Sequence, residues 1–274
     1  MTSPDDAFTT SSHDAMQSLN HLPQAEARGL RGVLFDLDDT LLDHGKLTEA
    51  AYSALFRLRE SGLELYVVTG RPLAWVRLVG RLFPVDGGVG ENGGVMVGPG
   101  GRAVDHVTPA ERALRTARLA ELVREIRREF ADLEPPDDAS ERLSDFTFDI
   151  GETRTVAPAV VEQVTAFARA RGATVHVSSV HLHVGYDAVD KASGTVRMLR
   201  ALKGVDPTAA LARYAFVGDS ENDAACFGAF RTTVGVANLR GRPTLAPRFL
   251  TEAPRGRGVA ELARVLGALR ASAE

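Results

Sequence analysis

Short apolar runs that end abruptly in polar residues mark the strands of this chain. Residues 32–35, Gly-Val-Leu-Phe, form such a run without polar alternation, and an acidic cluster follows at once. A second run, residues 63–68, ends in a polar turn, and a third, residues 214–217, ends in another acidic cluster. Runs of this length without alternation are typical of strands buried on both faces, as in a parallel sheet.

A helical pattern separates the first two of these strands. Between residues 48 and 61, apolar residues recur at Ala51, Leu55 and Leu58, and Gly62 follows where a helix would end. Strand, helix, strand is a parallel unit with a right-handed crossover. Since ligands of such sheets bind beyond the carboxyl ends of the strands, we expect the polar residues after each strand to meet at one edge.

The middle of the chain, residues 87–187, has a different pattern. It predicts a glycine-rich hairpin at 98–101, helices over 109–130 and 158–171, and strands at 146–150, 174–177 and 181–186. The parallel pattern then resumes with a helix over 192–202 and the strand 214–217. This order predicts an α/β fold with a Rossmann-like parallel-sheet core and an inserted α+β part.

We therefore expect a core domain formed by residues 31–86 and 188–274, and a cap domain formed by residues 87–187. Residues 1–30 are rich in polar residues and lack the apolar centre of a signal peptide, so we expect a disordered leader there.

Composition adds few constraints. With 274 residues, 44% of them hydrophobic, the chain can bury a sizeable core. A net charge of −4 offers no broad basic field for nucleic acid or an anionic membrane, and no apolar run reaches the roughly 18–20 residues of a bilayer span. The single cysteine, Cys226, excludes a disulfide within the chain. We expect a cytoplasmic monomer or homodimer that acts on a small molecule.

Two acidic clusters follow strands of the predicted sheet. Asp36 and Asp38 follow the first strand, and Asp219 and Asp223 follow the last. Crowded carboxylates are stable as anions mainly when a cation joins them. Hard oxygen ligands without a Cys and His pairing nearby favour Mg²⁺ over zinc. Because Mg²⁺ usually completes its coordination with water and substrate phosphate, phosphate is the expected substrate group.

A hydroxyl and an ammonium are predicted at the same edge. Thr69 follows the second strand, and Lys191 precedes the helix that resumes the core. Positioned donors and cations of this kind stabilise a transferring phosphoryl group. Asp36 can attack phosphorus to form an aspartyl-phosphate. Asp38 can protonate the leaving oxygen and then activate water, a role typically worth about 10²–10⁴-fold in rate.

Simpler interpretations remain open for several residues. Acidic residues after a strand can form a solvated turn, and Thr69 can cap the helix that begins near Pro72. Lys191 can be an exposed lysine, although its charge opposes the dipole at a helix start. His181 and His183 share one face of a strand, and without a third ligand a surface or substrate-lining role is favoured over metal binding.

Taken in order, these motifs resemble the four motifs of the haloacid dehalogenase superfamily, over residues 31 to about 269. They are Asp36-Leu37-Asp38-Asp39-Thr40-Leu41, Thr69-Gly70-Arg71, Lys191, and Gly218-Asp219-Ser220-Glu221-Asn222-Asp223. The position of the insertion is similar to the subgroup with a large α/β cap. That subgroup includes Cof-like sugar-phosphate phosphatases, sucrose-phosphate phosphatase, mannosyl-3-phosphoglycerate phosphatase and eukaryotic-type phosphomannomutase.

The resemblance implies a Mg²⁺-dependent phosphatase that hydrolyses a small phosphomonoester, such as a sugar phosphate or a phosphorylated glycoside or glycerate. It implies that Mg²⁺ is held by the Asp36 carboxylate, the Asp38 backbone carbonyl and Asp219, with Asp223 assisting. The phosphoryl group is then expected at Thr69, Gly70 and Lys191, with further substrate contacts from Arg71, Asn92 and Asn238. One departure is Asp39, where the subgroup more often has glycine.

Three other functions share parts of this pattern. A phosphomannomutase has the same cap and motifs but returns the phosphate to the sugar. A phospho-acceptor receiver domain combines acidic residues with Thr and Lys, but it is much shorter and lacks an inserted cap. A catalytically silent binding protein would keep the fold, although all the expected catalytic side chains are present here.

Overall fold

A nine-stranded sheet forms the larger part of the protein. The computed structural model describes residues 16–178, 180–239 and 243–271. Neighbouring strands are parallel from β1 to β4 in the spatial order, and β5 and β6 are antiparallel. The order is β1 (Gln17–Ser18), β12 (Phe249–Leu250), β11 (Thr232–Gly235), β10 (Tyr214–Gly218), β2 (Gly32–Phe35), β3 (Glu64–Val68), β4 (Gly87–Gly90), β5 (Val95–Val97) and β6 (Ala103–Asp105).

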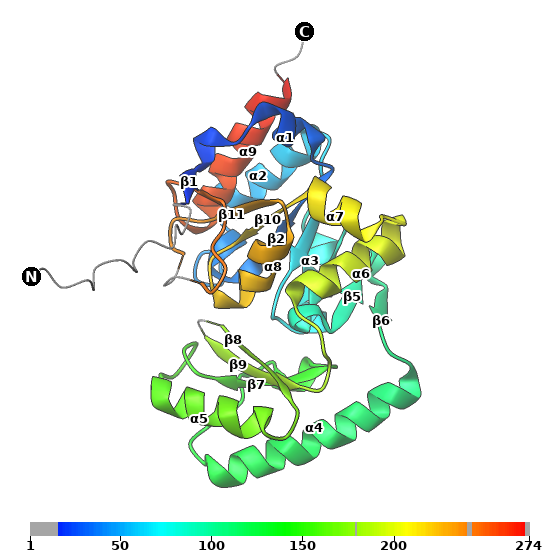
Figure 1. The fold of residues 1–274 in the computed structure, drawn as a ribbon, viewed down its shortest axis with the longest axis vertical. Coiled ribbons are helices and arrows are strands. Elements are labelled where there is room, and N and C mark those ends of the chain that lie inside the picture. The colour runs from blue at the N-terminus through cyan, green and yellow to red at the C-terminus, as the bar shows by residue number, and fades with distance from the viewer. Residues whose placement is uncertain (1–15, 179, 240–242, 272–274) are drawn as a thin grey trace, which may run out of the picture.

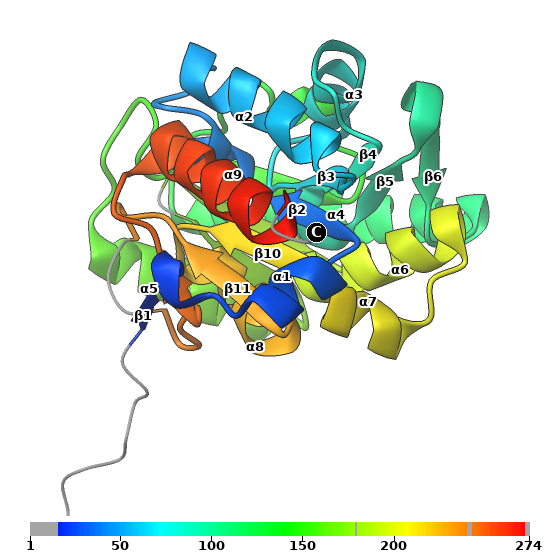
Figure 2. The same cartoon turned by 90° about the horizontal axis from the view of Figure 1, so that it is seen from above.

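Helices cover both faces of this sheet, as Figure 2 shows. Strand side chains alternate between two buried clusters: Val33 and Phe35 belong to one, and Leu34 to the other. Because both faces are buried, the strands need no polar alternation, which confirms the expected parallel sheet. One face carries α1 (Gln24–Gly29), α2 (Glu49–Glu60), α3 (Leu73–Leu82) and α9 (Arg255–Ala271), and the other carries α6 (Lys191–Lys203), α7 (Pro207–Arg213) and α8 (Ala224–Ala229).

A smaller three-stranded antiparallel sheet forms the second part of the protein. Its order is β7 (Asp145–Asp149), β9 (His181–Gly185) and β8 (Thr174–Val177). The helices α4 (Pro109–Glu129) and α5 (Pro158–Arg169) lie on the side away from the large sheet (Figure 1) and share a separate hydrophobic cluster with this sheet. The expected α/β class with an inserted α+β part is confirmed.

Short helical turns join these elements: η1 (Leu19–His21), η2 (Leu37–Leu41), η3 (Glu91–Gly93), η4 (Pro99–Gly101), η5 (Ala139–Glu141) and η6 (Glu221–Asp223). Within the described residues, no helix combines the length and the apolar character that crossing a membrane requires.

The strand pairing corrects one expected boundary. The sequence pattern predicts that residues 87–105 belong to the inserted part, but β4, β5 and β6 continue the large sheet from β3. The first strand of this segment, Gly87–Gly90, is mostly glycine, so it carries little of the apolar signal that marks the other core strands. The insertion thus begins after Asp105. The division into the core domain 31–86 and 188–274 and the cap domain 87–187 otherwise stays a prediction.

The expected leader is also corrected for residues 16–30. In this segment β1 pairs with β12, α1 packs against α9, and Leu19 and Leu22 are buried. Residues 16–30 contain few apolar side chains, and these are buried only when β12 and α9, from the distant end of the chain, fold beside them. Residues 1–15 lie outside the described residues.

The chain crosses between the two parts twice, at residues 106–108 and 186–190. Arg112, in the first turns of α4, joins both crossings. Its Nε donates to Asp105 at 2.7 Å, and its Nη2 lies 2.8 Å from the carboxylate of Asp187. Arg115 also pairs with Asp187. One buried guanidinium therefore fixes the spacing of the two crossings.

Replacing Gly93 by alanine is expected to lower the free energy of unfolding by about 1–3 kcal/mol. Gly93 has a φ of +109°, and a Cβ there would lie 2.3 Å from the carbonyl oxygen of Asp190. That oxygen belongs to backbone and cannot move aside easily. Urea unfolding measures the change. Gly29→Ala is the matched control, because a Cβ at Gly29 has nothing within 4 Å. Equal losses in both variants would contradict the prediction.

Candidate active site

The candidate site lies at the carboxyl ends of β2, β3 and β10. The parallel register places Phe35 beside Val67 of β3 and Val217 of β10. The residues that follow these strands, Asp36, Thr69 and Asp219, therefore emerge at one edge of the sheet.

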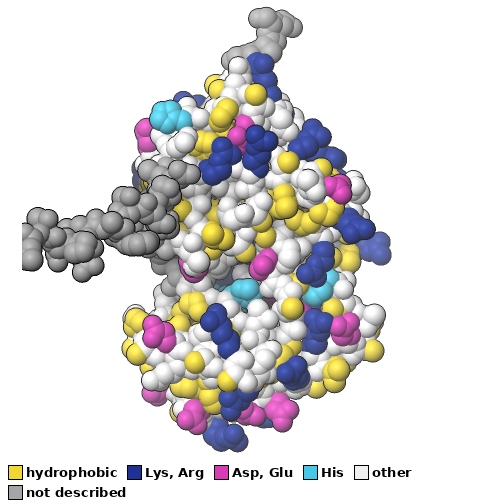
Figure 3. Space-filling model, in the orientation of Figure 1, with side chains coloured by type: hydrophobic (Ala, Val, Ile, Leu, Met, Phe, Trp, Pro, Cys, Tyr) yellow, Lys and Arg dark blue, Asp and Glu magenta, His cyan; other side chains and the backbone are white. Residues whose placement is uncertain are grey.

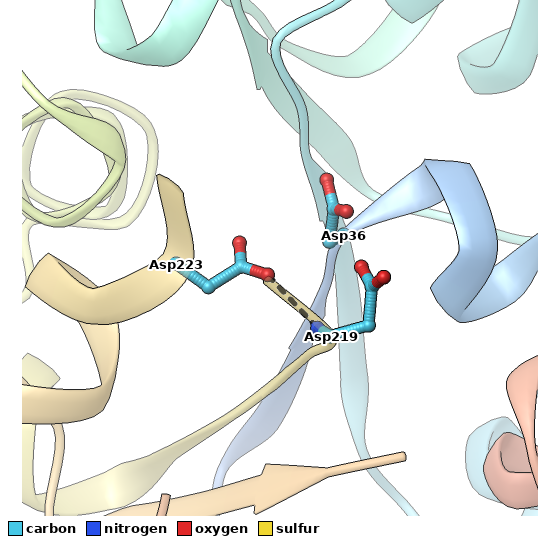
Figure 4. A group of neighbouring side chains, drawn as sticks. All are labelled: Asp36, Asp219 and Asp223. Atoms are coloured by element: carbon cyan, nitrogen blue, oxygen red, sulfur yellow. Dashed lines mark hydrogen bonds between the residues drawn. The ribbon is translucent and has the colours of Figure 1, made fainter. Parts of the chain in front are cut away.

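Three buried aspartates converge there (Figure 4). Oxygen atoms of Asp36, Asp219 and Asp223 lie within 4.8 Å of one another, and none of these residues is more than 4% exposed. Asp223 Oδ2 accepts hydrogen bonds from the backbone N–H groups of Asp219, at 2.9 Å, and Ser220, at 3.2 Å. Asp219 Oδ1 accepts one from the Thr40 hydroxyl at 3.1 Å. Asp219 Oδ2 is buried and has no hydrogen-bond partner.

Lys191 reaches this cluster from the first turn of α6. Its Nζ donates to Asp36 Oδ1 at 2.8 Å and to Asp223 Oδ1 at 2.7 Å, and the residue is 1% exposed. The side chain of Asp190 caps the helix by accepting from the Ser193 N–H. The simpler interpretation of Lys191 as an exposed lysine is therefore excluded.

Burial and the neighbouring acids raise the pKa of two carboxyl groups of this cluster, Asp36 and Asp219. Burial raises the pKa of Asp36 well above its usual value; Lys191 opposes this shift, whereas Asp223 and Asp219 add to it. Burial and the neighbouring Asp223 raise the pKa of Asp219 to about 7. Burial alone would lower the pKa of Lys191, but Asp223 and Asp36 raise it above its usual value. The ammonium is thus held charged between two acids.

This arrangement fits a divalent cation. When all three carboxylates are ionised they face one ammonium, so two negative charges lack a partner within the cluster. The orphaned Asp219 Oδ2 supplies a ligand atom, and all the available donors are hard oxygens. Asp36 and Asp219 are the residues best able to hold such an ion, because both oxygens of Asp223 already accept hydrogen bonds within the protein.

The loop after Asp36 is held by residues distant in the sequence. Asp39 has a φ of +55°, a left-handed conformation that Asp tolerates and glycine adopts freely, which explains why glycine is common there in the resembling subgroup. Asn238 Nδ2 donates to the Asp39 carbonyl at 2.8 Å, and Asn238 Oδ1 accepts from Arg255 N–H at 2.7 Å. The structure does not bring the Asn238 amide to the cavity described below, and its expected contact with substrate stays a prediction.

The turn after β3 brings Thr69, Gly70 and Arg71 to the site. Thr69 is fully buried, and its Oγ1 accepts from the Arg71 N–H at 3.1 Å. A Cβ at Gly70 would lie 3.2 Å from Asn92 Oδ1 and 3.3 Å from His183 Nε2, so a larger residue would fill this space.

Asn92 is buried in a left-handed backbone conformation beside this turn. Its φ is +51°, and neither polar atom of its amide has a hydrogen-bond partner. Buried polar groups without hydrogen-bond partners persist mainly where a ligand or a mechanism uses them. The geometry is thus compatible with the expected substrate contact.

A small cavity, partly open to solvent, connects these residues to the smaller sheet. Figure 3 shows a hollow between the two parts, with histidine and acidic side chains along it on that face. From the large-sheet part, the cavity is lined by Asp36, Asp38, Gly70, Arg71, Ser220 and Asn222. From the smaller part, it is lined by Ser178, Val180, His181 and His183.

Sequence reasoning missed several of these lining residues. Ser220 and Asn222 lie between Asp219 and Asp223 in the last acidic motif, so their place in the sequence could have predicted that they line the site. Ser178 and Val180 carry no such signal, because only the placement of the smaller sheet brings them to the cavity.

The two histidines have partners other than a metal. His181 Nε2 lies 2.7 Å from Glu152, and His183 Nδ1 lies 3.1 Å from Asp145. Burial lowers the pKa of His183 to about 3 although Asp145 opposes the shift, so this ring is neutral. Among the described residues, only the three aspartates form a cluster with metal-binding geometry.

Comparisons with known proteins agree with this geometry. The model of the family of haloacid dehalogenase-like hydrolases matches residues 33–132. The phosphoglycolate phosphatase of Methanothermobacter thermautotrophicus is 29% identical over 238 residues, which are 86% of this chain and 98% of that protein. The phosphoglycolate phosphatase of Methanococcoides burtonii is 26% identical over 235 residues, 85% of this chain and 94% of that protein.

Solved structures share the fold at lower sequence identity. A Thermoplasma acidophilum protein superposes with a TM-score of 0.72 at 18% identity, covering 88% of this chain and 99% of that chain. The sucrose-phosphatase of Synechocystis, solved with sucrose and phosphate, superposes with a TM-score of 0.64 at 18% identity, covering 86% and 98%. At such identities the likeness concerns the fold alone.

Proposed function

Because this chain belongs to the haloacid dehalogenase superfamily and is a phosphatase, we propose that it hydrolyses a small phosphomonoester in a Mg²⁺-dependent reaction. The observation that carries the proposal is the buried cluster of Asp36, Asp219, Asp223 and Lys191 at the edge of a cavity. A divalent cation would compensate the excess negative charge of this cluster. The cation and the Lys191 ammonium together would attract a phosphate group.

In the first step, an oxygen of Asp36 attacks phosphorus. A P–O bond to Asp36 forms while the bond to the leaving oxygen breaks, and Asp38 donates a proton to that oxygen. In the second step, water attacks the aspartyl-phosphate, Asp38 takes a proton from the water, and the bond between Asp36 and phosphorus breaks. Free phosphate and the original carboxylate result.

The remaining residues hold the phosphoryl group and the ion. Lys191 and the Thr69 hydroxyl offer donors to phosphoryl oxygens, and Gly70 leaves room for them. Asp36, Asp219 and the backbone carbonyl of Asp38 would hold Mg²⁺, while Asp223 orients Lys191 and the turn after β10. When bound, Mg²⁺ neutralises charge that develops on the phosphoryl oxygens.

For the substrate, we favour a small phosphorylated acid such as 2-phosphoglycolate over a sugar phosphate. Two relatives that align along nearly their whole length are named phosphoglycolate phosphatases. Sugar phosphates and phosphorylated glycerates remain the second class to test.

Phosphate release from a panel of phosphoesters tests the proposal. The panel should contain 2-phosphoglycolate, 3-phosphoglycerate, hexose 1- and 6-phosphates, a polyol phosphate and a nucleotide, each with Mg²⁺ and with a chelator. We expect Mg²⁺-dependent release that is highest with 2-phosphoglycolate. Isomerised sugar without free phosphate would identify a mutase instead, and binding without any turnover would identify a silent binding protein.

A further inference from the structure

Arg71 links the proposed acid/base to the smaller part of the protein. Its Nε and Nη2 donate to the two oxygens of Asp38, at 2.9 and 3.1 Å. Nη2 also donates to Glu152 Oε1 at 2.9 Å, and Nη1 lies 3.5 Å from Asp138 Oδ2. Arg71 and Asp38 belong to the large-sheet part, whereas Glu152 and Asp138 belong to the insertion. A single guanidinium thus spans the boundary at the cavity.

Glu152 is held rigidly by its own loop. Asp149 accepts hydrogen bonds from the backbone N–H groups of Gly151, Glu152 and Thr153, at 3.0, 2.8 and 2.9 Å. The other oxygen of Glu152 lies 2.7 Å from Nε2 of His181, a buried residue on β9. Two contacts and a closed turn therefore fix the Glu152 carboxylate, although residues 151–153 are exposed.

We infer that Glu152 is a positioning residue for phosphoryl transfer, which holds Arg71 against Asp38 and so couples the seating of the smaller part to the orientation of the acid/base. This inference rests on the proposed function. Within the described part of the chain, the hydrogen bonds to the Asp38 carboxylate come from Arg71, and Arg71 is held in turn by Glu152. Without Glu152, the Arg71 guanidinium can move toward another carboxylate, such as that of Asp138. The Asp38 side chain then loses its orientation.

The geometry also argues against the alternative that Arg71 and Glu152 serve mainly to bind substrate. Both Nε and Nη2 of Arg71 already donate to carboxylates of the protein, and its guanidinium lies 5.1 Å from the ring centre of Trp75. A carboxylate at the position of Glu152 would repel an anionic substrate. The Glu152 carboxylate is therefore better suited to accept a hydrogen bond from Arg71 than to contact a phosphorylated substrate.

The test compares two substrates that differ in their need for a proton. The leaving group of 4-nitrophenyl phosphate departs readily without one, whereas an alkoxide needs one. For Glu152→Ala, we expect kcat/KM to fall about 10–100-fold with the alkyl phosphate that the wild type hydrolyses fastest. With 4-nitrophenyl phosphate we expect a change within about threefold. We use kcat/KM because it reports the steps up to departure of the leaving group.

Two further variants control the comparison. Glu152→Gln keeps an oxygen that can accept from Arg71 and should lose much less activity. Glu141→Ala removes an exposed glutamate of the same insertion and should change neither rate. Equal losses with both substrates, or no loss with either, would overturn the inference. If the wild type hydrolyses neither substrate, the proposed function itself fails.

Discussion

Replacing Asp36 by asparagine is expected to reduce phosphate release by a factor of about 10⁴ or more. Asparagine has nearly the same size, so the packing after β2 is kept, but its amide cannot accept the phosphoryl group. The substitution also removes one of the two acids that hold Lys191, while the contact of Lys191 with Asp223 remains. We therefore expect a folded protein that lacks the nucleophile.

The measurement is phosphate release with Mg²⁺ from the preferred substrate of the panel. Asp132→Asn is the matched control, because Asp132 is exposed and distant from the site. Acid quenching of the wild type during turnover should trap a phosphate on the peptide that contains Asp36, and the variant should show none. Full Mg²⁺-dependent activity of Asp36→Asn would exclude the proposed mechanism.

Replacing Lys191 by methionine is expected to lower the free energy of unfolding by about 3–5 kcal/mol, besides abolishing most activity. Methionine fills a similar volume, but Asp36 and Asp223 are then buried without their shared cation. Breaking a buried ion pair costs more than its net contribution to folding, because the remaining charge stays away from water.

Urea unfolding in the presence of a chelator measures this cost. Lys203→Met provides the control on the same helix, since Lys203 is partly exposed and lies 3.4 Å from Glu64. Pairs of that kind contribute at most about 1 kcal/mol. If the two variants lose similar stability, Lys191 does not hold the aspartates together in the way proposed.

The strands and the site edge could be predicted from sequence for a common reason. An apolar run such as 32–35 is buried on both faces whatever covers it, and a polar residue that follows must lie at the edge. The ends of parallel strands then bring Asp36, Thr69 and Asp219 together without further information. The position of Lys191 at the site could be predicted from its place at the start of a helix. Its contacts with Asp36 and Asp223 could not.

Other features depend on contacts between distant segments, which no local pattern specifies. Residues 16–30 are ordered because they pair with β12 and pack against α9. Strand β4 pairs with β3 in the large sheet although it is mostly glycine. Arg71 and Glu152 are 81 residues apart and meet only because the smaller sheet lies over the cavity. Asn238 likewise contacts the backbone of Asp39 across the sheet edge.

The buried Arg112 has a consequence for how substrate enters. Because it ties Asp105 and Asp187 together, we expect the two crossings of the chain to act as a single hinge. We then expect the smaller part to rotate about that point instead of sliding across the large sheet. The end of the β8–β9 hairpin, near Ser178 and Val180, lies at the opposite end of the small sheet from the start of α4 (Figure 1). A small rotation would then widen the cavity most beside Asp36, where the phosphate of the proposed substrate would arrive and leave.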